Sequence, residues 1–375
     1  MYYMSMDDVL TSKANQIYLW LLDEFHAGRI GVAERLPSEN ELCVRFAVSR
    51  PQARLALARL AHEGRIRTIR GKGTYRLDSD RNGNKDIAVV LPNLDSYIYP
   101  EIVSSASTTL RQRGYQALFD CSDSDPQTEL HILERLLERK PAGIIISPLQ
   151  EVPGGGSKSL QLLKQIRLAG TALLLLDNVL GETAFSSIVM DDYGAGIAAA
   201  NFLISRGHAR VAVCWSPGHA PFNVRAKGFL DEAARQLGAE GERQRDGRRE
   251  WWLESRGELR TGDWGKAIEG FFSMQQRPTA IFCVNDLLAL SVRDTARSLG
   301  IQIPQDLSLI GFDDSPIARI PEIGLTSFVY PSGLIGKKAA NLLVDSIEAG
   351  PPASRNSVVM ESVLTERTTV ASPPD

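Results

Sequence analysis

The chain contains little cysteine and little histidine. Its 375 residues include four cysteines and five histidines. The cysteines are scattered and form no CxxC pair, which is typical of a reduced cytoplasmic protein without disulfides. No HExxH motif is present either, so the usual patterns of a zinc site are missing. We therefore expect neither a metal ion nor any other cofactor.

Long apolar runs are missing as well. The most apolar stretch, residues 171–176, is far shorter than the roughly 20 residues that a membrane-spanning helix needs. Residues 1–8 lack the basic segment and apolar core of a secretory signal, so we expect a cytoplasmic chain with no membrane partner. The contents of 43% hydrophobic and 23% charged residues are ordinary for a globular protein. The length suggests two or three domains.

Catalytic motifs are also lacking. Gly71-Lys72 does not belong to a phosphate-binding loop, because Ile66 stands where that motif needs a glycine. The three glycines at residues 154–156 have no preceding strand pattern. Since no pair of base and nucleophile is recognisable, we do not expect an enzyme. A transport protein that binds solutes is disfavoured by the missing export signal and by a strongly basic segment near the amino end.

Two helix starts follow each other closely near that amino end. Ser38 precedes a helical pattern with Glu41 three positions later, and Ser49 and Gln52 repeat the arrangement. Both pairs predict capping boxes, in which each residue binds the other's backbone N–H. The second helix should run over residues 50–62, and two short helices joined by a tight turn indicate a helix-turn-helix. Its predicted inner face consists of apolar residues at helical spacing, namely Ala53, Leu57 and Leu60.

A hairpin pattern follows the second helix. Residues 65–70 alternate with the period of a strand, residues 71–73 form a tight turn, and residues 74–77 return as a second strand. A hairpin in this position is the wing of a winged helix-turn-helix. We place this α+β domain at residues 1–78 and a polar linker at residues 79–85.

The winged region is strongly basic. Between residues 45 and 76 there are nine Lys or Arg against one acid, Glu63, although the chain as a whole has a net charge of −3. The outer face of the second helix carries Arg50 and Arg54. Because the charge lies on the elements that would face DNA, we interpret it as an attraction for phosphates rather than as an ordinary solvated surface.

This region resembles the GntR family of winged-helix repressors over roughly residues 12–77. The resemblance rests on Leu36-Pro37-Ser38-Glu39, Val48-Ser49-Arg50, Arg54 and Gly71-Lys72-Gly73-Thr74. In that family the arginines that match Arg50 and Arg54 contact bases and phosphates from the major groove. The turn that matches residues 71–73 reaches the minor groove.

The pattern and the resemblance together predict the residues that contact DNA. They are Ser38, Glu39, Arg45, Ser49, Arg50, Gln52, Arg54, Arg70, Lys72, Gly73 and Thr74. Gln52 has two interpretations, because it could read adenine or merely close its capping box. Asn40 and Pro51 stand where many members of the family carry Arg and Thr, which affects the operator sequence rather than DNA binding itself.

From residue 86 onward, strand and helix patterns alternate. Strands are predicted over residues 87–91, 116–119, 143–147, 172–177, around 188, and over 211–215, 280–284 and 307–310; helices are predicted up to 113 and over 127–139, 160–168, 195–205, 225–237, 264–274 and 287–299. Such alternation indicates parallel sheets covered by helices on both faces. The number of units exceeds one sheet, so we expect an α/β domain of two lobes over residues 86–375.

Polar side chains follow several of these strands. Ligands of parallel sheets bind outside the carboxyl ends of the strands, and this rule selects Tyr97, Tyr99, Asp177, Arg225, Asn285, Asp286 and Asp313. Carboxylates, an amide, a guanidinium and aromatic rings suit a polyhydroxylated ligand. Alternatives remain, because Asn285-Asp286 could only cap a helix and Asp177 could only form a turn.

This second region resembles the effector domain of the LacI/GalR repressor family, whose fold is shared with periplasmic sugar-binding proteins. The resemblance covers roughly residues 86–370 and rests on residues 89–92, 191–195, 203–208, 225–229, 285–286, 303–314 and 325–326. It implies two lobes joined by three crossovers, with a ligand between them. Positions matching Arg225, Asn285, Asp286 and Asp313 line that cleft in the family, and the position of Tyr330 often faces it.

A GntR-type head on a LacI-type body is the arrangement of repressors of the bacterial arabinose-repressor type. We therefore predict a ligand-responsive transcriptional regulator that binds double-stranded operator DNA as a homodimer. The expected function is repression of carbohydrate-utilisation genes, released by a monosaccharide or a derivative of one. The alternatives are an activator, or a regulator that responds to a metabolite other than a sugar.

Overall fold

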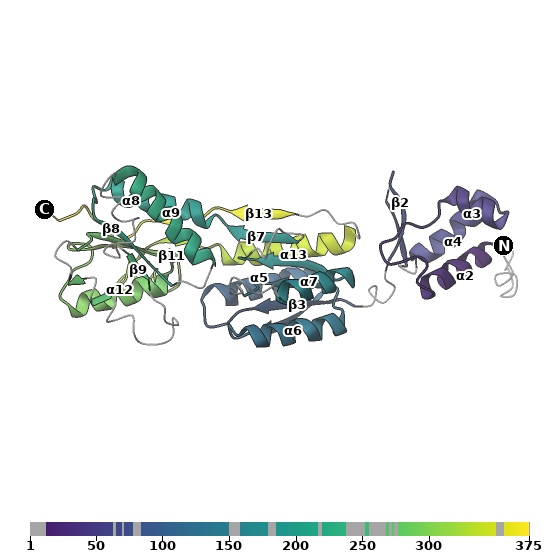
Figure 1. Ribbon diagram of the computed structural model, residues 1–375, viewed down its shortest axis with the longest axis horizontal. Coiled ribbons are helices and arrows are strands. Elements are labelled where there is room, and N and C mark those ends of the chain that lie inside the picture. The colour runs from purple at the N-terminus through teal and green to yellow at the C-terminus, as the bar shows by residue number, and fades with distance from the viewer. Residues whose placement is uncertain are drawn as a thin grey trace.

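The computed structural model describes most of the chain. The described residues are 13–62, 65–69, 71–77, 84–149, 158–178, 185–216, 220–237, 252–254, 268–269, 272–273, 277–349 and 356–374. They form a small amino-terminal head and a body of two lobes (Figure 1). No helix in these ranges is long and apolar enough to cross a membrane.

The head is a winged helix-turn-helix. Its elements are α2 (Lys13–His26), α3 (Glu39–Phe46), α4 (Arg50–His62), β1 (Ile66–Ile69) and β2 (Gly73–Arg76). The two strands pair in antiparallel fashion, with Ile66 opposite Arg76. The predicted inner face of α4 is confirmed, because Ala53, Leu57 and Leu60 are buried with Leu42 in the core of the head.

One of the two predicted capping boxes forms completely. The Ser38 hydroxyl accepts the Glu41 N–H at 3.3 Å, and the Glu41 carboxylate accepts the Ser38 N–H at 2.6 Å. The second prediction was only half right. The Gln52 side-chain oxygen accepts the Ser49 N–H at 3.1 Å, but the Ser49 hydroxyl donates to that same oxygen instead of accepting a backbone N–H. A glutamine oxygen offers two lone pairs, so it can satisfy both donors.

The first lobe of the body, the N-lobe, contains a parallel sheet of six strands in the order β13-β7-β6-β5-β3-β4. These strands are β3 (Asp86–Leu91), β4 (Gln116–Cys121), β5 (Gly143–Ile146), β6 (Ala172–Leu176), β7 (Ser186–Met190) and β13 (Ser357–Met360). Helices α5 (Ile98–Gln112) and α13 (Ser332–Ala349) pack on one face, while α6 (Pro126–Arg139) and α7 (Lys158–Leu168) pack on the other. Alternate residues of β3 therefore enter two different cores, as a strand buried on both faces requires.

The second lobe, the C-lobe, is built on a sheet in the order β14-β12-β11-β10-β8-β9. Its strands are β8 (Val211–Trp215), β9 (Trp252–Glu254), β10 (Ala280–Cys283), β11 (Ser308–Asp313), β12 (Thr326–Val329) and β14 (Leu364–Thr365), and only β14 is antiparallel to its neighbour. Helices α8 (Asp192–Ser205), α9 (Ala220–Leu237) and α12 (Asp286–Ser298) accompany it. Phe229, Phe282, Phe312 and Phe328 form a chain of ring contacts in its core.

The chain passes between the lobes three times, as expected. It crosses from β7 to α8, from β12 to α13, and from β13 to β14. Because of the second crossing, α13 follows a C-lobe strand yet lies beside α5 in the N-lobe (Figure 1). The elements after residue 325 were not predicted as strands or helices. The strands β13 and β14 have only four and two residues and carry little periodicity, whereas α13 was missed despite its 18 residues.

Candidate functional site

The outward face of α4 carries the predicted major-groove residues. Arg50 and Arg54 are exposed there. The Arg54 guanidinium forms a double contact with Glu39, at 3.2 Å from Nε and 3.0 Å from Nη2. This pairing lowers the pKa of Glu39 and raises that of Arg54. Glu39, predicted to contact DNA, thus holds the Arg54 side chain from the start of α3 and leaves its Nη1 group for another partner.

The wing presents its turn to solvent. Lys72 is exposed at the tip, where the Tyr75 hydroxyl donates to its carbonyl at 3.1 Å. Gly73 has φ +122°, and a Cβ on it would lie 2.6 Å from the Arg35 side chain, so glycine is needed. The hydroxyls of Thr74 and Thr68 are 3.0 Å apart across the hairpin. Arg70 lies outside the described residues.

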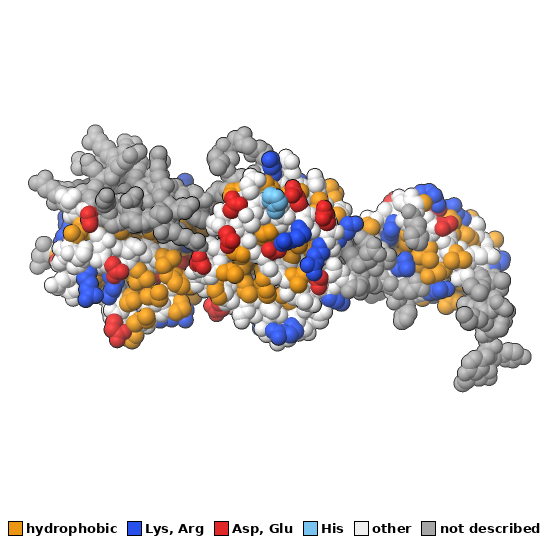
Figure 2. Space-filling model, turned by 90° about the horizontal axis from the view of Figure 1, so that it is seen from below, with side chains coloured by type: hydrophobic (Ala, Val, Ile, Leu, Met, Phe, Trp, Pro, Cys, Tyr) orange, Lys and Arg blue, Asp and Glu red, His pale blue; other side chains and the backbone are white. Residues whose placement is uncertain are grey.

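Several of the nine basic residues are held against the head itself. Arg45 stacks on Trp20 at 4.1 Å, Arg59 on Tyr18 at 3.8 Å, and Arg76 on Phe25 at 4.8 Å. Arg59 also donates to Asn15, and Arg76 to the Ile30 carbonyl. The charge available to phosphates is therefore more localised than the count along the sequence indicates. Blue basic side chains interspersed with orange apolar ones cover the head in Figure 2.

In the body, polar side chains from both lobes meet in a group whose members are buried or half-buried. We call Asp177, Asp192, Arg225, Asp313 and Tyr330 the interlobe cluster. Arg225 is its only guanidinium and is 3% exposed. It pairs with Asp192 at 2.6 Å, donates to the Val284 carbonyl at 2.7 Å, and lies 3.5 Å above the Phe312 ring. Arg225 lies inside α9, because that helix begins five residues earlier than predicted.

Two glycines bring Asp192 and Arg225 together. A Cβ on Gly196 of α8 would lie 2.1 Å from the Arg225 carbonyl oxygen, and one on Gly228 of α9 would lie 2.2 Å from the Tyr193 carbonyl oxygen. Only glycine permits so close an approach of two helix backbones. The paired side chains lie at this contact, so the packing of α8 on α9 fixes their geometry.

Asp177 lies at the carboxyl end of β6 and accepts two hydroxyl groups. One donor is Tyr330, which follows β12. The other is Ser147, which follows β5 and whose hydroxyl lies 3.3 Å from the carboxylate. Burial raises the pKa of the carboxyl group despite these bonds. Asp177 has φ +59°, in the left-handed region. Asp177 therefore forms a turn and also accepts hydrogen bonds, so its two interpretations from the sequence do not exclude each other.

Asp313 is the last residue of β11 and has φ +109°, a strained backbone conformation for a residue other than glycine. Burial raises its pKa well above the usual range, and Asp177 and Asp192 raise it further. Burial raises the pKa of Tyr97, which comes from the N-lobe, and the charges of Asp286 and Asp313 raise it further. The buried Tyr97 hydroxyl has no hydrogen-bond partner among the described residues. Tyr99 is also buried, and its pKa is raised by burial and by Asp177.

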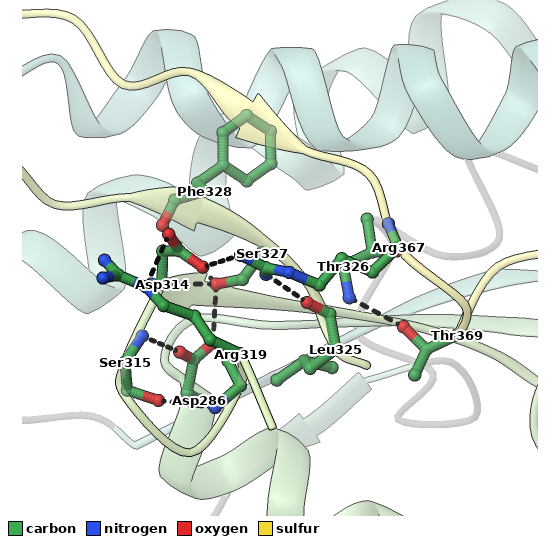
Figure 3. A network of polar contacts seen from close by, with 11 residues as sticks. Asp286, Asp314, Ser315, Arg319, Leu325, Thr326, Ser327, Phe328, Arg367 and Thr369 are labelled. Atoms are coloured by element: carbon green, nitrogen blue, oxygen red, sulfur yellow. Dashed lines mark hydrogen bonds and ion pairs between the residues drawn. The ribbon is translucent and has the colours of Figure 1, made fainter. Parts of the chain in front are cut away.

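Asn285 and Asp286 have structural partners. The Asn285 side chain caps α12 by accepting the Leu288 N–H at 2.8 Å, which the alternative interpretation expected. Asp286 is fully buried and accepts the Ser327 hydroxyl and the Ser315 N–H, both at 2.7 Å (Figure 3). Both its oxygens are thus engaged by the protein. Asp286 therefore connects α12 to β12 and to the segment after β11, and its contact with a ligand stays a prediction.

A neighbouring network ties the last crossover to the C-lobe sheet. Asp314 accepts Arg319 at 3.1 Å and Arg367 at 2.6 Å, and Arg367 also donates to the Leu325 carbonyl (Figure 3). Both carboxylate oxygens of Asp314 are therefore engaged by guanidinium groups. Its two guanidinium partners agree with a structural role.

Three polar residues of this region were missed as site candidates. Asp192 is the partner of Arg225, Ser147 donates to Asp177, and Asn178 has a buried side-chain oxygen without a partner in the described structure. Ser147 and Asn178 follow strands β5 and β6, so the strand-end rule could have found both. Asp192 opens a helix, and its role appears only when α8 packs on α9.

Comparisons with known proteins find separate matches for the head and for part of the body. Residues 13–75 match the gntR family of bacterial regulatory proteins, and residues 200–370 match the periplasmic binding protein-like domain. The arabinose metabolism transcriptional repressor of Geobacillus stearothermophilus is 29% identical over 342 residues, which cover 89% of each protein.

Solved structures share the fold of the body. A periplasmic binding protein/LacI transcriptional regulator from Alkaliphilus metalliredigens, complexed with D-xylulofuranose, has a TM-score of 0.60 at 23% identity and covers 76% of this chain and 99% of that one. A LacI family regulator from Enterococcus faecium with bound ribose has a TM-score of 0.62 at 20% identity, covering 77% and 99%. The chain therefore joins a winged-helix head that matches the gntR family over residues 13–75 to a body with the periplasmic binding protein-like fold.

Proposed function

We propose that the protein is a transcriptional repressor of carbohydrate-utilisation genes, released from its operator by an uncharged sugar bound at the interlobe cluster. It would act in the cytoplasm as a homodimer that places two heads on two half-sites. The relative from Geobacillus stearothermophilus is named a repressor of arabinose metabolism, and two structural neighbours hold a pentulose and ribose. These names support a pentose as the first ligand to test.

The DNA-binding half of the proposal is supported by the outward face of α4. Arg54 is exposed there and oriented by Glu39, and Lys72 stands at the tip of the wing. A guanidinium with free N–H groups can bind the two acceptors of guanine in the major groove, which contributes about 1–3 kcal/mol of discrimination. Lysines and arginines around it would add salt-dependent affinity for phosphates.

One observation carries the ligand-binding half, the buried Tyr97 hydroxyl that has no hydrogen-bond partner among the described residues. A buried polar group without a partner costs about 1–3 kcal/mol. A ligand hydroxyl between Tyr97 and Asp313 would satisfy the phenol and the carboxylate together. Asn178, with its unpartnered oxygen, offers a second acceptor in the N-lobe.

The charge of the cluster favours a ligand without negative charge. Three carboxyl groups, those of Asp177, Asp192 and Asp313, surround one guanidinium, and burial raises the pKa of all three. An anionic ligand would add charge of the same sign to a desolvated site. Sugar hydroxyls instead donate to carboxylates and accept from Arg225. We therefore expect sugar acids and sugar phosphates to bind more weakly than the parent sugars.

Ligand binding can reach the heads because the cluster belongs to both lobes. Asp177 and Tyr97 come from the N-lobe, while Arg225 and Asp313 come from the C-lobe. A sugar that contacts both would favour one relative arrangement of the lobes, and a dimer would transmit the change to the spacing of its heads. A coupling of about 1–3 kcal/mol would lower operator affinity roughly 5- to 150-fold.

The test combines two measurements on the full-length protein. Thermal-shift screening against pentoses, hexoses, uronic acids and sugar phosphates identifies a ligand. Fluorescence anisotropy on duplexes selected from a random pool then measures DNA affinity with and without that ligand. We expect a neutral sugar to raise the melting temperature and to weaken DNA binding. Absence of salt-dependent binding to any duplex would refute the proposal. Tighter binding with ligand would indicate a co-repressor or an activator, and a shift with uronic acids or sugar phosphates only would refute the uncharged sugar.

A further inference from the structure

The outward face of α4 contains an exposed leucine next to its arginine. Leu55 is 63% exposed, whereas Leu57 and Leu60 of the same helix are buried. Residues 51, 54, 55 and 58 are spaced so that they share one face of a helix, and all four are exposed. Apart from Arg54, this face consists of Pro51, Leu55 and Ala58. The helix therefore presents an apolar stripe beside Arg54, with Arg50 and Arg59 exposed at its borders.

The core of the head does not account for Leu55. The inner face of α4 is already complete, with Ala53, Ala56, Leu57 and Leu60 packed against the other helices. An exposed leucine gains little from folding, because its side chain remains in water. It gains free energy only if another molecule covers it. The neighbouring arginines and the wing identify that molecule as DNA, since they place the same face toward a polyanion.

The major groove offers a specific apolar partner. Among the four bases only thymine carries a methyl group on its major-groove edge, and apolar side chains contact it there. The polar edges of guanine, cytosine and adenine would instead be desolvated by a leucine without any compensating hydrogen bond. A leucine at this position thus discriminates by favouring thymine and penalising the other bases.

We infer that Leu55 is a specificity-determining residue that reads a thymine methyl group in the operator, with Pro51 and Ala58 flanking the contact. Arg54, held by Glu39, reads a guanine beside it. This inference rests on the proposed DNA binding and goes further, because it assigns a base to a residue. It also gives Pro51, which departs from the family pattern, a role on the reading face.

The experiment replaces thymine by deoxyuridine, which lacks only the methyl group. Duplexes are first selected from a random pool with the full-length protein, and each thymine of the consensus is then replaced in turn. We expect one or two positions at which deoxyuridine lowers affinity by a factor of about 3 to 10. Leu55→Ala should bind the thymine and deoxyuridine duplexes equally well, while Leu19→Ala, which removes an exposed leucine from α2, should discriminate as the wild type does.

Each outcome has a clear meaning. If no consensus is selected and no duplex binds, the proposed function fails and the inference falls with it. If a consensus is bound but no thymine methyl matters, the inference alone is wrong. The same holds if Leu55→Ala retains the wild-type sensitivity to deoxyuridine. Melting curves of the variants check folding, and the thymine comparison on the wild-type protein requires no variant at all.

Discussion

At the scale of single residues, the contact between Arg54 and Glu39 joins the two helices of the helix-turn-helix motif. The Arg54 side chain is exposed and that of Glu39 is half-buried at the surface, so their ion pair adds little to stability. Its effect is geometric, because it holds a long side chain in one orientation before DNA arrives. A pre-oriented guanidinium loses less conformational entropy on binding.

We predict that Arg54→Ala lowers operator affinity by at least about 10- to 100-fold, since a bidentate contact to guanine is worth about 1–3 kcal/mol. The melting temperature and the affinity for the sugar should not change. Arg235→Ala is a matched control, because Arg235 is an exposed arginine paired with Glu232 on a helix of the body. Fluorescence anisotropy on the selected operator measures the first effect. Equal operator affinities of the two variants would contradict the prediction.

Asp286 illustrates a buried carboxyl group whose role is structural. Burial raises its pKa to about 6 from an ordinary value of 3.8, despite the hydrogen bonds from Ser327 and Ser315. The folded protein therefore holds the proton more tightly than the unfolded chain does. The stability due to this group is fully present below pH 4 and is lost as the pH rises to about 6.

We predict that Asp286→Asn removes this part of the pH dependence. Relative to the wild type, the free energy of unfolding of the variant should increase by up to about 3 kcal/mol between pH 4 and pH 7. Asparagine retains an oxygen for the Ser315 N–H and can donate to the Ser327 hydroxyl. Urea denaturation of both proteins across this range measures the difference. Parallel curves for the two proteins would show that Asp286 titrates normally.

At the scale of elements, the packing of α8 on α9 decides where the cation of the interlobe cluster lies. Gly196 and Gly228 allow the two backbones to touch, and the pair of Asp192 with Arg225 follows from that approach. Breaking this buried ion pair would leave an uncompensated charge, which is more costly than losing a surface pair. The same packing thus serves both stability and the proposed ligand site.

We predict that Gly228→Ala destabilises the body by at least about 1–3 kcal/mol, because a Cβ at 2.2 Å from the Tyr193 carbonyl oxygen forces the helices apart. Ligand binding should weaken as well, since Arg225 moves with α9. Asn223→Ala, an exposed change on the same helix, should alter neither property. Differential scanning calorimetry and ligand titration would measure both effects. An unchanged melting temperature would mean that the two helices can separate without cost.

At the scale of the whole molecule, the proposed regulation requires the body and the heads to respond to one another. The interlobe cluster links strand ends of both sheets, and three crossovers connect the lobes. A ligand can shift such an equilibrium only through different affinities for the two arrangements. A residue that contacts the ligand in only one arrangement of the lobes supplies this difference. Its substitution should therefore abolish the release of DNA by the ligand.

We predict that Asp313→Ala gives a protein that binds its operator with wild-type affinity but is not released by the sugar. The substitution leaves the backbone strain at φ +109° in place, because alanine disfavours that conformation as well. Asp294→Ala on the surface of α12 is the control and should respond normally. Operator binding is measured with increasing sugar concentrations. Normal release of Asp313→Ala would remove this residue from the ligand site.

The local sequence determined the elements and the class of the protein. Capping residues, the period of apolar positions and the basic hairpin predicted the head, and strand-helix alternation predicted the two lobes. These features depend on neighbours a few residues away, so a single sequence reveals them. The strand-end rule also selected Asp177 and Asp313, because parallel strands bring their carboxyl ends to one edge.

Only the tertiary structure decided how side chains are used. In the folded protein, Asp286 accepts a hydrogen bond from Ser327 of the sheet, and Glu39 pairs with Arg54. Arg59 and Arg76 stack on aromatic rings of the head. The Tyr97 hydroxyl has no partner among the described residues. These contacts join residues far apart in the chain. The energies of these contacts depend on how deeply the side chains are buried and on which way they point, and local sequence patterns encode neither. The sequence therefore located the candidate site, and the tertiary structure determined which side chains belong to it.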